Sequence, residues 1–264
     1  MMTYTDLMAS ASVIDGALHI DVPEGWQQGR ATFGGLSAAI MFKAAEKLAP
    51  EGAFLRTTQI CFIAPSDGVA HAQARILRQG RSATFIEVDL IGRQAITCRA
   101  VFVFGGAREN DFSFNYCQSP DVAAPDDCPD FFEVPVRPQF AQHFDARLAY
   151  GDRLFTGSDK RSVVLWVRHA DGHAGGMASF LAAADMVPSA ILPMHDTYAP
   201  ASSVTWQVDL TTDAHRLHAN RSEWFLIQSE AENAGEGYTS QNMKVWNSSR
   251  NLLAASRQCV AVFG

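Results

Sequence analysis

The chain has 264 residues and a formal net charge of -7, with 47% hydrophobic and 19% charged residues. This is the composition of an ordinary globular protein, which excludes a disordered or fibrous chain. No basic run or basic-aromatic cluster appears, so nucleic acid is not an expected partner. Five scattered cysteines form no Cys-x-x-Cys pair, which indicates a reducing compartment without a disulfide framework.

The N-terminal residues have neither the basic region nor the apolar core of a signal peptide. No apolar run reaches the roughly 20 residues that would span a bilayer. Together with the cysteine usage, these features predict a cytoplasmic protein.

The first half of the chain predicts a short strand, a buried helix and an antiparallel sheet. Residues 17–22 alternate as a strand does. Phe33-Gly34-Gly35 then opens a segment from Leu36 to Leu48 that is apolar nearly all round, which predicts a buried helix. The strands expected next have the short spacings of antiparallel hairpins and cover residues 55–64, 71–79, 82–91 and 95–104.

Residues 106–138 differ in composition from their surroundings and predict a linker. Prolines and aspartates gather there, which is typical of irregular structure. The segment also holds the aromatic residues Phe112, Phe114, Tyr116, Phe131 and Phe132. We expect these rings to pin the linker to the protein surface.

The second half repeats the order of the first. Strands are predicted over residues 144–150 and 162–169, and Gly175-Gly176 opens a helix that runs from Met177 towards Ile191. The remaining strands are predicted over residues 204–210, 224–232, 238–247 and 252–263. Both halves end in an apolar run closed by Phe-Gly, at Gly105 and at Gly264.

A duplicated unit follows from this order, with an N-terminal repeat over 1–105 and a C-terminal repeat over 139–264. An alanine-rich buried helix wrapped by a long antiparallel sheet is the hotdog arrangement. The predicted class is therefore α+β, as a double hotdog. Two such repeats should pack on each other, with a site where they meet.

Four motifs carry a resemblance to a known family. They are Phe33-Gly34-Gly35 at the first helix entry, the Arg-x-Gly-Arg-Ser turn within residues 77–82, the helix end Phe180 to Asp185, and the last strand from Leu253 to Gln258. In this order they resemble the type II acyl-CoA thioesterases and their thioesterase-like relatives. The resemblance covers nearly the whole chain.

The resemblance implies hydrolysis of an acyl-CoA to free acid and CoA, without a metal, a cofactor or a covalent intermediate. In the family an aspartate, a threonine or serine, and a glutamine hold the attacking water. Asp185 and Gln258 match by motif, and Ser203 is the favoured hydroxyl. The family often has threonine, with an acidic residue two positions later, whereas this chain has Thr205 at that later position. Thr205 is therefore the other candidate hydroxyl. Double-hotdog relatives commonly pair, so a homodimer or larger assembly is expected.

These residue types suit thioester hydrolysis. A carboxylate near a buried helix accepts a proton from water, while a hydroxyl and an amide orient that water. A glycine-entered helix at Gly34 and Gly35 offers backbone N–H groups to the developing oxyanion. Arg81, in the glycine turn, is a candidate contact for CoA phosphate.

Structural roles for the same residues stay open on the sequence alone. Asp185 suits a helix-end cap, and Gln258 suits an ordinary strand residue. Gly34-Gly35 suits close helix packing. Arg78 and Arg81 suit a solvated turn.

Other functions are weighed against hydrolysis. A non-catalytic protein that binds acyl-CoA or acyl groups is the main alternative. A hotdog hydratase or dehydratase acting on enoyl-CoA is a third, less favoured alternative. The absence of a Gly-x-Ser-x-Gly motif disfavours a serine hydrolase, and no dinucleotide or Walker fingerprint appears.

Overall fold

A computed structural model describes residues 2–66, 68–93, 95–133, 137–219 and 221–263. Within these residues, a 12-stranded antiparallel sheet has the strand order β1-β2-β6-β7-β8-β5-β11-β14-β13-β12-β10-β9, and a small second sheet pairs β3 with β4. The predicted domain ends at residues 1 and 264, and residues 134–136 of the predicted linker, lie outside the described residues.

The first repeat contains the predicted helix and strands, with shifts of a few residues at their ends. Its elements are α1 (Tyr4–Ala9), β1 (Ser12–Ile14), β2 (Ala17–Asp21), η1 (Glu24–Trp26), β3 (Gln27–Gln28), β4 (Ala31–Thr32), α2 (Gly34–Glu46), β5 (Phe54–Phe62), β6 (Val69–Gln79), β7 (Thr84–Ile91) and β8 (Ile96–Gly105). The short helix α1 was not predicted. It starts at Thr3, whose hydroxyl accepts a hydrogen bond from the Asp6 N–H at 3.2 Å.

The predicted linker contains one short helix, η2 (Pro125–Asp127). The second repeat follows the plan of the first. Its elements are η3 (Gln139–His143), β9 (Phe144–Tyr150), β10 (Ser162–His169), α3 (Gly176–Ala184), η4 (Leu192–Met194), β11 (Ala201–Leu210), η5 (Thr212–Arg216), β12 (Phe225–Gly235), β13 (Tyr238–Asn247) and β14 (Leu252–Val262). The prediction that the helix runs towards Ile191 is wrong, because α3 ends at Ala184 with Asp185 as its C-cap. Pro188 has no backbone N–H to continue a helix.

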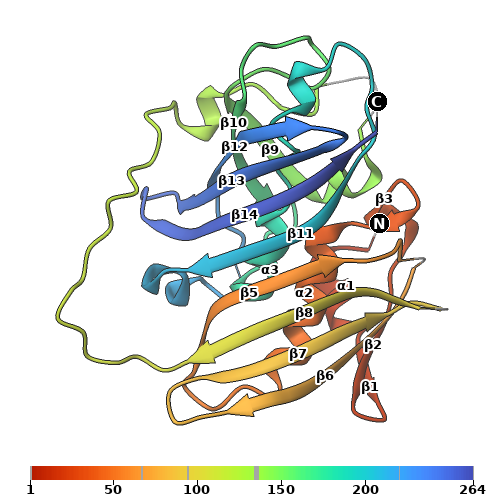
Figure 1. Cartoon of the computed structure of the whole chain (residues 1–264), viewed down its shortest axis with the longest axis vertical. Helices are drawn as coiled ribbons and strands as arrows, with labels where there is room; N and C mark the ends of the chain where they lie inside the picture. The colour runs from red at the N-terminus through yellow and green to blue at the C-terminus, as the bar shows by residue number, and fades with distance from the viewer. Residues whose placement is uncertain (1, 67, 94, 134–136, 220, 264) are drawn as a thin grey trace.

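The two repeats join edge to edge through β5 and β11 (Figure 1). Gln59 pairs with Gln207 near the centre of this antiparallel ladder. Each strand carries a bulge three residues earlier, at Arg56 in β5 and at Val204 in β11. The matching positions indicate that a local two-fold axis relates the repeats at their junction.

The helices α2 and α3 pack against each other on one side of the sheet (Figure 1). Nearly all of α2 is buried, which confirms the prediction made from its apolar sequence. A Cβ on Gly35 would lie 2.5 Å from the Ala182 carbonyl oxygen, so the start of α2 meets the end of α3. This crossing brings one helix terminus from each repeat to the same place.

The segment between β8 and β9 crosses the other face of the second repeat. The indole N–H of Trp246 donates to the Cys117 carbonyl at 3.1 Å, and that of Trp166 to the Ala123 carbonyl at 2.9 Å. Arg250 stacks over the Trp166 ring at 4.7 Å and donates to two further carbonyls of the segment. The segment therefore covers a small apolar cluster around these tryptophans.

Pinning of the linker was predicted from its own aromatic residues, and that part is wrong for three of them. Phe112, Phe114 and Tyr116 are 72–85% exposed, whereas Phe131 is buried. The anchors come instead from tryptophans of the sheet. Among the described helices, none is long and apolar enough to cross a membrane.

Candidate active site

Asp185 stands where α2, α3 and β14 meet. It ends α3 as the C-cap, and its carboxylate accepts a hydrogen bond from the Gln258 side-chain amide, Nε2 to Oδ1 at 2.6 Å. The backbone N–H of Gly35, in the first turn of α2, donates to the same carboxylate. One charged group thus bridges the start of one helix, the end of the other and the sheet.

Burial raises the pKa of the Asp185 carboxyl to about 7, and the hydrogen bonds from Gln258 and Gly35 only partly offset this rise. A carboxyl with this pKa exists in both protonation states near neutral pH. That is the range in which a general base exchanges protons efficiently.

A buried amide holds Gln258 in place. Gln241, directly across on β13, donates from Nε2 to the Gln258 Oε1 at 2.9 Å. Gln241 in turn accepts the Ala190 backbone N–H at Oε1, at 3.1 Å. Trp206 lies across from Gln258 on the other side, in β11. Gln258 is 3% exposed and Gln241 is fully buried, so neither can exchange its partners for water.

The glycines at the start of α2 are needed for close approach. A Cβ on Gly34 would lie 2.7 Å from the Asp185 Oδ2, and one on Gly35 would meet the Ala182 carbonyl. The packing role considered for Gly34-Gly35 is therefore present. Gly35 also acts as a donor, because its N–H reaches Asp185.

The two candidate hydroxyls lie on opposite faces of the sheet. Ser203 pairs with Val260, which is buried on the same face as Gln258, so Ser203 is one inward-facing position away from that glutamine. The bulge at Val204 turns Thr205 outward, opposite Cys259, where it is exposed. The strand register therefore puts Ser203 on the same face of the sheet as Gln258, opposite Val260 two residues along β14, and Thr205 on the other face.

Models of known families match both repeats. The acyl-CoA thioesterase N-terminal domain matches residues 22–105, and the acyl-CoA thioesterase C-terminal domain matches residues 121–262. The chain belongs to the acyl-CoA thioesterase family. The family resemblance drawn from the sequence is thereby confirmed. A comparison with curated proteins finds no match.

Solved structures of similar fold span the whole chain. A conserved protein of unknown function with a hot dog fold from Alicyclobacillus acidocaldarius is 24% identical with a TM-score of 0.89, covering 100% of this chain and 99% of its own. The acyl-CoA thioesterase II TesB2 from Mycobacterium marinum is 16% identical with a TM-score of 0.72, covering 98% of each chain. The tesB protein from Mycobacterium avium subspecies paratuberculosis is 14% identical with a TM-score of 0.76, covering 99% and 100%. These similarities confirm the double-hotdog fold.

Arg81 does not approach the site within one chain. Its turn precedes β7, whose first residue pairs with Phe104, and Phe104 pairs with Leu55 near the start of β5. The start of α2, where Asp185 lies, packs against Phe62 at the opposite end of β5. Seven residues of strand separate these ends, about 23 Å. Arg81 is exposed at its turn.

Gln241 was missed in the sequence although a signal for it exists. Gln241, Met243 and Val245 alternate along β13 on its buried face. A glutamine in that phase needs a partner, because an unpaired buried amide is costly. Cys98 was also treated only as a core residue, although it lies close enough for the Asp185 charge to influence its thiol.

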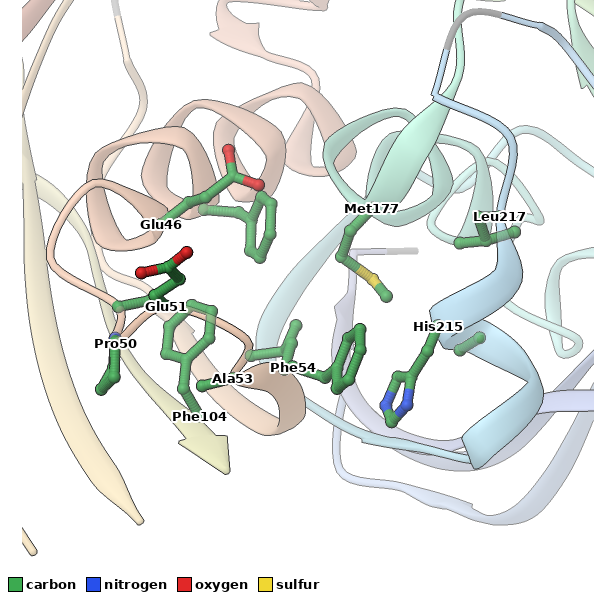
Figure 2. Close-up of a pocket in the computed structure, with 13 residues that line it drawn as sticks. Glu46, Pro50, Glu51, Ala53, Phe54, Phe104, Met177, His215 and Leu217 are labelled. Carbon is green, nitrogen blue, oxygen red and sulfur yellow. The ribbon is translucent and has the colours of Figure 1, made fainter. Parts of the chain in front are cut away.

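A pocket of about 340 Å³ lies at the other end of the helix pair, where α2 ends and α3 begins (Figure 2). Its lining combines apolar side chains with Glu46, Glu51 and His215, and the His215 ring stacks on Phe54 at 4.1 Å. The local two-fold relates this end to the Asp185 site. There Leu55 takes the position of Ser203 before the bulge, and Phe102 takes that of Gln258.

The start of α3 is also closed at this end. The Gly176 N–H donates to the His218 carbonyl at 2.7 Å. A Cβ on Gly175 would lie 2.2 Å from that same oxygen. The hydroxyl and the amide of the Asp185 site thus lack counterparts here, and the start of α3 contacts its own chain instead of a carboxyl from the other helix.

Proposed function

We propose that this protein hydrolyses an acyl-CoA thioester to free acid and CoA by direct attack of water, with Asp185 as the general base. One observation carries the proposal. A buried carboxylate with a pKa near 7 is held by a glutamine amide at the junction of the two repeats. Such perturbed carboxyls are typical of functional sites.

In this mechanism the Asp185 carboxylate accepts a proton as the water oxygen bonds to the thioester carbonyl carbon. Gln258 and Ser203 orient the water. Because the water is already positioned when the reaction starts, the entropic part of the activation barrier is lower. The carbonyl oxygen becomes an oxyanion beside the first turn of α2 at Gly34, where helix N–H groups have no intrahelical acceptor. The C–S bond then breaks, and the CoA thiolate leaves and takes up a proton.

A covalent route through the nearby cysteine does not fit. Burial raises the pKa of the Cys98 thiol to about 12, opposed in part by hydrogen bonds with Thr97 and Ser37. The thiolate, not the thiol, is the nucleophile. Cys98 is therefore neutral at physiological pH, which disfavours it as the attacking group.

Assembly and location belong to the same proposal. We propose a homodimer or larger assembly in the cytoplasm, with a role in lipid metabolism. Five free cysteines suit a reducing compartment. A role for Arg81 in CoA binding then requires that it act at the site of a neighbouring copy. Light scattering at micromolar concentration tests the assembly, and a monomer would contradict it.

The test of function is release of CoA thiol from a series of acyl-CoA chain lengths. The wild type should turn over at least one of them, and Asp185→Asn should lower turnover about 10²–10⁴-fold, the usual contribution of general acid–base catalysis. Asp126→Asn, at an exposed linker position, is the matched control and should be fully active. A fully active Asp185→Asn would refute the mechanism. A wild type that binds acyl-CoA but hydrolyses none would instead support the non-catalytic binding protein.

A further inference from the structure

We propose that Gln241 is a positioning residue that fixes the direction of the Gln258 amide, so that its NH₂ group faces Asp185. The inference rests on the proposed function, because it concerns the same site. It starts from a row of hydrogen bonds that runs from the Ala190 backbone through Gln241 and Gln258 to Asp185.

The polarity of this row is set at its backbone end. A glutamine amide has a donor end and an acceptor end of nearly the same shape, so shape alone does not choose its direction. The Ala190 N–H only donates, so the Gln241 oxygen must face it. The Gln241 NH₂ group then points to Gln258, whose oxygen must accept it. The Gln258 NH₂ group is left facing Asp185.

Burial makes it costly to reverse the direction of either amide. Gln241 is fully buried, and its NH₂ group also contacts the Met243 sulfur at 3.8 Å. Reversing either amide would place oxygen against oxygen or leave the Ala190 N–H unpaired. An unsatisfied buried polar group costs more than a typical hydrogen bond contributes. No such cost would arise at an exposed glutamine.

The direction of the Gln258 amide matters for the charge on Asp185. Among the described residues, the carboxyl accepts hydrogen bonds from the Gly35 N–H of α2 and the Gln258 amide of β14, and the Cys98 thiol of β8 lies close enough to be influenced by its charge. Of these only Cys98 titrates, and burial keeps its thiol neutral. A donor from Gln258 favours the carboxylate, whereas its oxygen would favour the protonated acid. Gln241 therefore keeps Asp185 available as a base.

Gln241→Met tests this inference, because methionine is of similar size and offers no amide donor. Val245→Ala, on the same buried face of β13, is the control for stability alone. We expect the acid limb of the kcat profile to move up by about one pH unit in Gln241→Met, which lowers kcat about tenfold at a pH below both midpoints. KM should change less than twofold. Val245→Ala should keep the wild-type midpoint.

A double variant tests whether Gln241 acts through Gln258. If it does, adding Gln241→Met to Gln258→Met should cause no further loss of kcat. Additive losses would overturn the inference, and so would a wild-type midpoint in Gln241→Met.

Two further measurements separate this inference from the proposed function. The Asp185 carboxyl can be titrated by ¹³C NMR, with Asp185→Asn to assign its signal, and the shift with Gln241→Met is expected even if no acyl-CoA is hydrolysed. If Gln241→Met does not fold, side-chain hydrogen exchange in the wild type replaces it. The Gln241 and Gln258 NH₂ protons should then be protected, and free exchange at Gln241 would overturn the proposal.

Discussion

Asp185 combines two opposing demands on one side chain. Ionisation is needed for the proposed base, yet burial makes ionisation unfavourable. The amide of Gln258 and the N–H of Gly35 recover part of that cost. The balance leaves a carboxyl that titrates near neutral pH, and both activity and stability should show it.

The pH dependence of hydrolysis follows from the Asp185 pKa of about 7. Only the carboxylate accepts a proton, so kcat/KM should rise through a midpoint near pH 7 and level off above it. The measurement is kcat/KM between pH 5 and 9 on a single acyl-CoA. A rate that stays constant down to pH 5 would show that Asp185 is not the base.

Asp185→Asn should stabilise the protein at alkaline pH. The native pKa is about 7, against an ordinary value of 3.8, so between these values the folded state binds a proton that the unfolded state lacks. The stability contributed by this proton is present below about pH 4 and is lost as pH rises through 7. Asparagine carries no such loss.

Melting temperatures of wild type and Asp185→Asn at pH 4 and pH 8 check this expectation. The variant should gain most at pH 8 and little at pH 4. An equal or lower melting temperature at pH 8 would identify Asp185 as a simple helix cap.

The contact between α2 and α3 depends on a missing side chain. The Ala182 carbonyl oxygen lies 2.5 Å from the position that a Cβ on residue 35 would occupy. Helices approach this closely only when one presents glycine, and here the approach also brings the Gly35 N–H to Asp185. The packing of the helices and the proposed catalysis therefore depend on the same position.

Gly35→Ala should destabilise the fold by about 1–3 kcal/mol, the usual cost of overpacking. Turnover should fall as well, because the two helix ends move apart around Asp185. Denaturant unfolding and thiol release on the same preparation measure both effects. Gly172→Ala is the control, since a Cβ there meets no atom within 4 Å. A Gly35→Ala protein with wild-type stability would show that the helices can shift without cost.

The sheet was predictable where more and less buried positions alternate along a strand, as they do in β2 and β13. The end of α3 was not, because Met186 to Ala190 stay largely buried after the helix has stopped. An apolar sequence pattern predicts that a segment is buried, but not that it is helical. Residues 186–190 stay largely buried without helical hydrogen bonds. Pro188 was the local signal that marked the limit.

Some residues of the candidate site could likewise be predicted from the sequence, and others could not. Asp185 and Gln258 were predicted from motifs near the helix end and the last strand. The choice between Ser203 and Thr205 depended on a bulge, which shifts the inward-facing phase by one residue and has no clear sequence signature. The distance between Arg81 and Asp185 depended on which end of the sheet the hairpin of Arg81 occupies, and that is set by long-range strand pairing.

The molecule as a whole is a two-fold arrangement in which one of two equivalent positions keeps its polar groups. At the other, Leu55 and Phe102 replace the hydroxyl and the amide. The start of α3 there is closed by its own chain. A duplicated architecture therefore carries a single proposed catalytic site.

One acyl-CoA should bind per chain. Calorimetric titration with a non-hydrolysable thioether analogue should give a stoichiometry near 1, and Asp185→Asn should bind the analogue with similar affinity. A stoichiometry near 2 would mean that the pocket at the other end of the helix pair also accepts the ligand.

The junction of β5 with β11 also bears on how the chain is made. β5 ends at Phe62, 148 residues before β11 ends at Leu210, and until β11 is made this edge of β5 lacks its partner and is open to pairing with other chains. The bulge and central glutamine that β11 presents are also present in β5 itself, so a second nascent chain offers nearly the same partner. The linker favours the correct pairing, because a tethered strand has an effective concentration on the order of millimolar. Pairing of β5 with β11 of the same chain should therefore outcompete pairing with a second chain, because the two strands are tethered.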